Sequence, residues 1–99
     1  MVETLRVALM KINDDILISY TDIIYDKFLI NLFFKKKYKN ITLPIKTNWR
    51  KVWDIRGKKA EQDAETLIFK KDKLLEIGGK IQNINTIKAQ FMGLLFIPK

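Results

Sequence analysis

Ten basic side chains with two tryptophans among them are the residues of this chain most suited to binding chemistry. Residues 35–59 hold ten of the 19 Lys and Arg residues against a single acid, Asp54, and the 99-residue chain has a net charge of +8. Cationic side chains neutralise phosphates, and the flat indoles of Trp49 and Trp53 suit stacking on nucleobases. The combination favours a nucleic-acid surface over an inert basic face. The ten bases are Lys35, Lys36, Lys37, Lys39, Lys46, Arg50, Lys51, Arg56, Lys58 and Lys59.

Catalytic chemistry, in contrast, lacks its usual residues. The chain has no cysteine and no histidine, which removes disulfides, thiol nucleophiles, zinc fingers and histidine acid–base catalysis. A serine triad is excluded because Ser19 is the single serine and has no histidine to activate it. The glycines form no phosphate-binding loop, and no D-x-D or E-x-x-E pattern indicates a carboxylate metal centre. We therefore expect no enzyme, no catalytic residue, no metal and no cofactor.

Membrane association is not expected either. The longest apolar runs, 28–34 and 91–97, are far shorter than the ~20 residues that a helix needs to cross a bilayer. The first residues show neither the cationic and apolar regions of a signal peptide nor the composition of a transit peptide. We expect a protein that works where it is made or from which a presequence has been removed.

Hydrophobic periodicity predicts the elements that must position the basic block. Alternation indicates a strand over 4–11, and a broad apolar face indicates a helix over about 15–34. The exposed polar stripe expected on that helix is Asp15, Ser19, Asp22 and Asp26. The later elements expected are strands over 41–46, 66–71 (continued at 74–77) and 94–97, and a short helix over 84–91 capped by Asn83. This order predicts an α+β, ferredoxin-like β-α-β-β-α-β fold, a four-stranded antiparallel sheet with two helices on one face.

The basic block lies mainly in the connection between the second and third predicted strands. Residues 46–65 are too many for a tight turn, and Trp49 and Trp53 lie in a segment of extended pattern. Gly57, followed by two lysines, indicates a loop tip. We therefore predict a single domain over 1–99 from which a long, basic, two-stranded arm projects.

With this order of elements, the chain resembles the small-subunit ribosomal protein S-ten family. The resemblance rests on residues 41–44 (Ile-Thr-Leu-Pro) followed by Lys46, on residues 74–77 (Leu-Leu-Glu-Ile), and on an opening strand at 5–9. It covers nearly the whole chain by spacing, at low identity. The arm tip of the family is replaced by residues 55–58 (Ile-Arg-Gly-Lys), and the first proline of its strand motif is a threonine here.

The resemblance implies a structural constituent of the small-subunit head that binds ribosomal RNA. The ten bases would contact the RNA backbone, and the neighbours would be the S-three, S-nine and S-fourteen families rather than a second copy of the chain. Trp49 and Trp53 would either stack on RNA or a partner, or brace the arm and the core. The divergence implies a mitochondrial ribosome in the matrix, with the cytoplasm of a low-GC bacterium as the alternative.

Two other functions remain open from the sequence. A free RNA-binding module shares the predicted topology but has an aromatic strand signature that is missing here. A small accessory subunit of an organellar complex would also be basic, and its apolar helix over 15–34 would face a partner.

Overall fold

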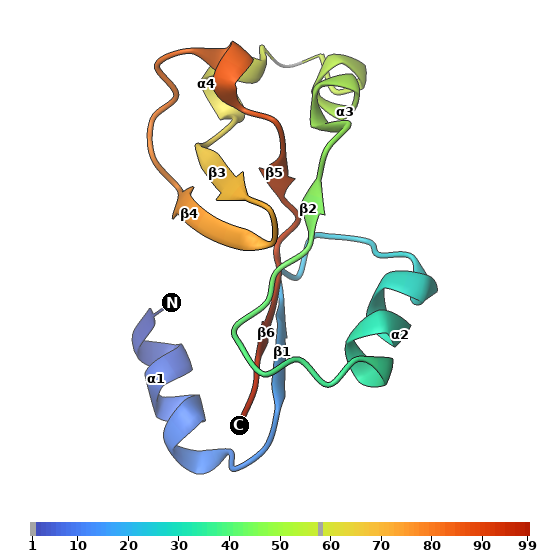
Figure 1. Ribbon diagram of the computed structural model, residues 1–99, viewed down its shortest axis with the longest axis vertical. Helices are drawn as coiled ribbons and strands as arrows, with labels where there is room; N and C mark the ends of the chain where they lie inside the picture. The colour runs from blue at the N-terminus through green and yellow to red at the C-terminus, as the bar shows by residue number, and fades with distance from the viewer. Residues whose placement is uncertain (1, 58) are drawn as a thin grey trace. The chain divides into compact units, whose positions relative to one another are not determined.

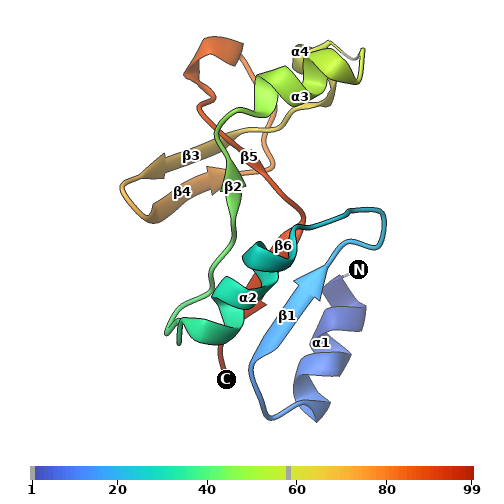
Figure 2. The ribbon, with the colours of Figure 1, turned by 90° about the vertical axis from the view of Figure 1, so that its right-hand side faces the viewer.

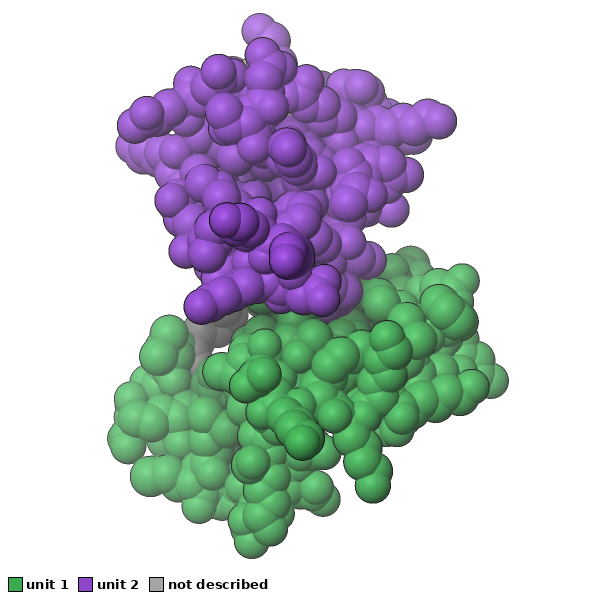
Figure 3. Space-filling view, in the orientation of Figure 1, with its two compact units in different colours: residues 1–43, 93–99 green, residues 44–92 purple. Residues whose placement is uncertain are grey.

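The computed structural model describes residues 2–57 and 59–99, and the chain divides into two compact units. Unit 1 consists of residues 1–43 and 93–99, and unit 2 of residues 44–92 (Figure 3). Both contain helices and short antiparallel strands, which confirms the predicted α+β class. The assignment of 1–99 to a single domain stays a prediction. Within the described residues, no helix has the length and apolar character needed to cross a bilayer.

Unit 1 is built on a two-stranded antiparallel ribbon with a helix on each side. Its elements are α1 (Val2–Lys11), β1 (Ile16–Ser19), α2 (Lys27–Lys35) and β6 (Leu94–Ile97). β1 pairs with β6 so that Ser19 lies opposite Leu94, and α1 and α2 flank the ribbon (Figure 1, Figure 2). Because side chains alternate along a strand, Leu17 packs into the core while Ile18 lines a groove beside α1.

The core of unit 1 lies between the ribbon and α2. Phe33, Leu94 and Phe96 are buried, and Leu17 packs against them. The ring of Tyr38 lies 5.7 Å from that of Phe33 and 5.9 Å from that of Phe96, so three aromatic rings pack together. This cluster fixes β6, and through β6 the position of β1.

Unit 2 combines two small strand pairs with two short helices. Its elements are β2 (Ile45–Lys46), α3 (Trp49–Ile55), α4 (Ala60–Asp63), β3 (Leu67–Lys70), β4 (Lys73–Ile77), the 3₁₀ helix η1 (Ile84–Thr86) and β5 (Gln90–Phe91). β2 pairs with β5 and β3 with β4, both antiparallel. Trp49, Leu67, Ile87 and Ala89 are buried. The buried Gln90 exchanges two hydrogen bonds with the backbone just before β3, which joins β5 to this hairpin.

The predicted four-stranded ferredoxin-like sheet is wrong. The strands of the described residues form three separate two-stranded sheets. Residues 4–11 belong to a helix, because Leu5 and Ala8 are three positions apart and share one half-buried helix face that a strand would split. The predicted helix over 15–34 is a strand, a loop and a helix. Asp26 begins that helix, since its carboxylate accepts a 2.7 Å hydrogen bond from the backbone N–H of Phe28.

The predicted basic arm is also wrong, whereas several local predictions are confirmed. Residues 46–65 include β2, α3 and α4 and belong to compact unit 2. The two tryptophans are four positions apart, a helical spacing that places both on one face of α3. The strand expected at 94–97 is β6, and Asn83 does cap η1. The strand expected at 66–71 and continued at 74–77 is instead two strands, β3 and β4, that turn back on each other, and the helix expected over 84–91 is limited to η1 and followed by β5.

Candidate functional site

The loop that follows β1 is held by hydrogen bonds to one backbone carbonyl. The N–H of Tyr20 donates to the carbonyl oxygen of Gly93 at 3.0 Å, and the hydroxyl of Tyr25 donates to the same oxygen at 2.9 Å. The hydroxyl of Ser19 donates to the carbonyl oxygen of Tyr20 at 2.9 Å. The two ends of the loop are therefore held at one point of the chain between β5 and β6.

Gly93 makes this close approach because it has no side chain. Its φ of +76° is in the left-handed region, which favours glycine. A Cβ atom at this position would lie 2.9 Å from the ring of Tyr20 and would clash with the side chain of Ile23. The loop and β6 can therefore lie together only around a glycine.

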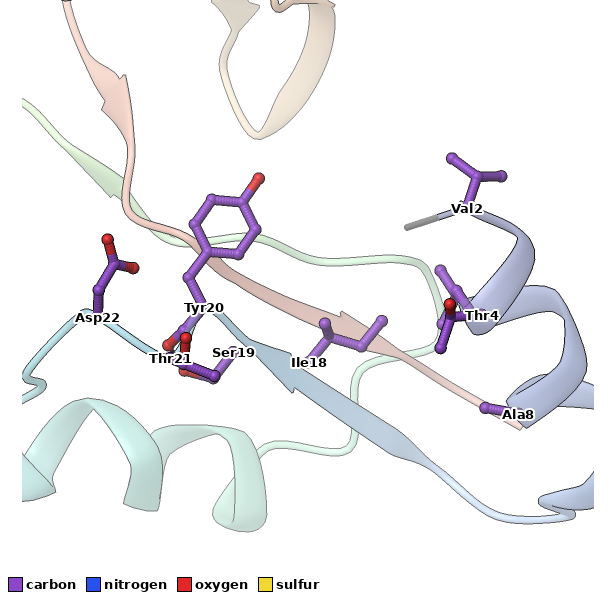
Figure 4. Close-up of a pocket in the computed structure, with 9 residues that line it drawn as sticks. Val2, Thr4, Ala8, Ile18, Ser19, Tyr20, Thr21 and Asp22 are labelled. Carbon is purple, nitrogen blue, oxygen red and sulfur yellow. Dashed lines mark hydrogen bonds between the residues drawn. The ribbon is translucent and has the colours of Figure 1, made fainter.

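An open groove in unit 1 runs from α1 to this loop. Val2, Thr4 and Ala8 lie at one end, and Tyr20 and Asp22 lie at the other (Figure 4). The α1 end is mainly aliphatic, whereas the loop end carries hydroxyl groups and one carboxylate. Leu5, Ile18, Ser19 and Thr21 complete the lining.

Asp22 is the one acidic side chain among the described residues that line the groove. It is exposed, and its carboxylate has no hydrogen bond or ion pair to any residue that the structure describes. A free carboxylate can bind a hard cation or accept hydrogen bonds from a sugar. No three His, Cys, Asp or Glu side chains of the described residues are grouped to hold a metal ion.

The ten bases predicted to bind RNA are divided between the two units. Four follow or end α2 in unit 1 and are exposed: Lys35, Lys36, Lys37 and Lys39. Five are in unit 2: Lys46, which is half-buried on β2, and Arg50, Lys51, Arg56 and Lys59 on or after α3. Lys58 lies outside the described residues. Their role in binding RNA stays a prediction, but they do not form the one continuous arm expected.

The two tryptophans pack against each other in unit 2. Trp49 is 1% exposed, and its Nε1 donates to the carbonyl oxygen of Ile87 at 3.2 Å. Trp53 is half-buried and meets Trp49 edge to face, with ring centroids 5.7 Å apart. The burial of Trp49 suits the bracing role, and the choice between bracing and stacking stays a prediction for both tryptophans.

Comparison with known proteins gives one curated relative at significant similarity. The chain is 31% identical over 80 residues to CTP:phosphoglutamine cytidylyltransferase of Campylobacter jejuni. The match covers 81% of this chain but 31% of the relative, so the chain spans about a third of the length of the protein it matches. No family model matches the chain, and no solved structure matches it.

This similarity corrects the function predicted from the sequence. We predicted a structural ribosomal protein, with an accessory subunit or RNA-binding module as alternatives, and no enzyme. The matched protein is an enzyme that transfers a nucleotide, which contradicts all of these predictions. The S-ten resemblance, the ribosomal partners and the mitochondrial location stay predictions. Asp22 was missed because its spacing to Ser19 and Asp26 also fits a helical stripe. The apolar run before it, at 16–18, contains two β-branched isoleucines and was the available strand signal.

Proposed function

We propose that this chain forms part of the CTP-binding site of a cytidylyltransferase. The observation that carries the proposal is the similarity over 80 residues to an enzyme named for CTP and a phosphorylated acceptor. In such a reaction an oxygen of the acceptor phosphate attacks the α-phosphorus of CTP, and pyrophosphate leaves. The protein must therefore bind a nucleotide triphosphate and balance its negative charge.

Asp22 supports this proposal because CTP is used as its magnesium complex. Mg²⁺ in nucleotide sites is usually bound through one or two protein carboxylates together with the substrate phosphates, without an all-protein cage. A single exposed carboxylate on a fastened loop suits this arrangement. The ion is then part of the substrate, and Asp22 would orient the triphosphate through it.

The other residues of the groove have the chemistry that suits the nucleoside part of CTP. The side chains of Leu5, Ala8 and Ile18 form an apolar wall against which a base can lie. The hydroxyls of Ser19 and Thr21 lie beside Asp22 at the other end (Figure 4). Such a groove offers apolar contact for the ring and polar partners for the ribose and phosphates.

Calorimetric titration of the 99-residue chain with CTP and MgCl₂ tests the proposal. We expect saturable binding that weakens about tenfold or more in Asp22→Asn, the loss that follows removal of one charged ligand. Asp72→Asn is the matched control, because Asp72 is an exposed aspartate in the β3–β4 turn of unit 2. Removing Mg²⁺ with EDTA should weaken the wild type to the level of Asp22→Asn. Equal affinity of Asp22→Asn and wild type, or no CTP binding at all, would contradict the proposal.

A further inference from the structure

Arg50 in α3 and Arg56 at the C-cap of α3 each lie over a tryptophan ring, but they differ in their hydrogen bonds. The Cζ atom of Arg50 lies 5.6 Å from the ring centroid of Trp49. Its Nη2 also donates to the carbonyl oxygen of Ile84 at 2.7 Å and to Oδ1 of Asn85 at 3.2 Å. The guanidinium of Arg50 therefore ties α3 to η1, and its donors have internal partners.

Arg56 has the same ring contact without those partners. It is the C-cap residue of α3, and its Cζ lies 5.1 Å from the ring centroid of Trp53. Its guanidinium makes no hydrogen bond or ion pair with any described residue. A guanidinium has five N–H donors in a planar fork, and attraction to a ring face uses none of them. Arg56 is therefore exposed and oriented, with its donors available.

The ring that orients Arg56 is itself fixed. Trp53 is half-buried and packs edge to face on Trp49, which is anchored by its hydrogen bond to Ile87. An arginine on such a support loses less side-chain freedom on binding than one that extends into solvent. This distinguishes Arg56 from Lys51, a neighbouring base of α3 that has no ring or hydrogen-bond partner among the described residues.

The charge around Arg56 favours an anion. Residues 46–59 contain six bases and one acid, Asp54, and residues 60–65 add three acids, so that the segment 46–65 keeps a net charge of +2. A local excess of positive charge attracts and concentrates anions, and the guanidinium fork then selects those with two acceptor oxygens in one plane. Phosphate groups meet both conditions.

We propose that Arg56, held over Trp53, binds a phosphate group of a substrate of the cytidylyl transfer. The inference rests on the proposed function, in which both substrates carry phosphates. The phosphate belongs either to the phosphorylated acceptor or to the nucleotide, and the chemistry of binding is the same for both. Arg56 makes a bidentate contact to two phosphate oxygens, and the neighbouring lysines supply the field that attracts the anion.

The test is titration of the full chain, without Mg²⁺, with three probes: phosphoglutamine, CTP and inorganic phosphate. Binding is measured by calorimetry and by tryptophan fluorescence, which reports an anion near Trp53. We expect saturable binding of at least one probe, weakened about tenfold in Arg56→Gln. Tighter binding of phosphoglutamine would identify the acceptor as the source, and tighter binding of CTP the nucleotide. Glutamine without phosphate should bind to neither the wild type nor Arg56→Gln.

Two further variants separate the guanidinium from its charge. Arg56→Lys keeps the charge and loses the fork, so affinity should fall by several-fold. Lys51→Gln removes one charge from the same helix and should change affinity by less than about twofold. If Arg56→Gln and Lys51→Gln lose the same affinity and Arg56→Lys keeps the affinity of the wild type, the proposal is overturned. The anion would then be attracted by the positive charge of the whole segment and not by the guanidinium of Arg56. Thermal unfolding curves should match wild type in all three variants.

The inference and the proposed function fail in different ways. If Asp22→Asn abolishes Mg²⁺–CTP binding but Arg56→Gln leaves the affinity for all three probes unchanged, the phosphate site is wrong and the function is supported. The opposite result has two parts: the wild type binds phosphoglutamine but no Mg²⁺–CTP, and Arg56→Gln does not bind phosphoglutamine. In that case the CTP site is wrong and the phosphate site is supported.

Discussion

The two units present their charged groups by different means. In unit 1, Asp22 lies on a loop that is positioned by hydrogen bonds to the backbone carbonyl of Gly93. In unit 2, Arg56 is positioned by a side-chain ring, which rests in turn on a second ring. The carboxylate therefore depends on the path of the main chain, and the guanidinium depends on the packing of tryptophans. Changes to the backbone should damage unit 1 most, and changes to aromatic packing should damage unit 2 most.

The largest expected effect is that of Gly93→Ala on unit 1. The added Cβ would clash with Ile23 and lie within 2.9 Å of the Tyr20 ring, in a backbone region that alanine disfavours. We expect the free energy of unfolding, measured by urea denaturation, to fall by about 3 kcal/mol because left-handed strain and overpacking act together. CTP binding should be lost as well, because the loop that carries Asp22 is displaced.

Gly57→Ala is the control that separates strain from overpacking. Gly57 also has a positive φ, +67°, but an added Cβ there would meet no atom within 4 Å. The free energy of unfolding of Gly57→Ala should therefore fall by only about 1 kcal/mol, from strain alone. If both alanines destabilise the protein equally, the close approach at Gly93 does not hold the loop.

The second effect compares the two tryptophans. Trp49→Phe removes the donor to the Ile87 carbonyl and leaves a cavity in a buried site, so we expect a loss of about 2 kcal/mol. The Nε1 of Trp53 is buried without a partner among the described residues. Trp53→Phe removes this unpaired donor along with part of the ring, so its loss should stay below about 1 kcal/mol. Urea denaturation of both variants measures the difference, and a larger loss for Trp53→Phe would reverse our assignment of the anchor.

The correctly predicted elements are those whose signals are local. The strands β3 and β4 coincide with the two apolar runs at 66–71 and 74–77, although the prediction of one continued strand missed the sharp turn between them, in which Lys71 adopts a positive φ of 54°. Asn83 is a residue type that favours helix caps, and its side chain accepts a hydrogen bond from the backbone N–H of Asn85. Such features need no knowledge of what packs on them.

The wrongly predicted elements are those decided by contacts distant in sequence. Residues 4–11 alternate and also have helical spacing, so periodicity alone does not choose between a strand and a helix. β1 becomes a strand by pairing with β6, almost eighty residues later, and the sequence near β1 does not contain that information.

The candidate site depends on the same distant contacts. The basic block was found from composition, but Arg50 and Arg56 differ only through Ile84 and Asn85, which accept from one and not from the other. The loop of Asp22 is positioned by hydrogen bonds to Gly93, a residue for which the sequence pattern predicted no role. Residue type thus predicted the charge of each site, and distant contacts determined which side chains are available.

The smallest expected effect concerns α1, which lines the groove of unit 1. Arg6 donates to both carboxylate oxygens of Glu3, at distances between 2.6 and 3.0 Å, and this hydrogen bond lowers the pKa of Glu3 below its usual value. A carboxyl whose pKa is lower in the folded state stabilises the fold above its unfolded pKa. That stabilisation is lost as the pH falls through the folded pKa. Acid should therefore loosen the first turn of α1 slightly.

NMR titration of the Glu3 carboxyl measures this effect directly. In Arg6→Gln the pKa of Glu3 should rise toward its usual value, and the α1 backbone shifts should lose their dependence on pH in the acidic range. Because both side chains are exposed, solvent screens the pair, so the variant should unfold at nearly the same urea concentration as wild type. An unchanged Glu3 pKa would show that the pair does not form in solution. A large loss of stability would instead show that the position of α1, like that of the Asp22 loop, depends on a contact more buried than this surface pair.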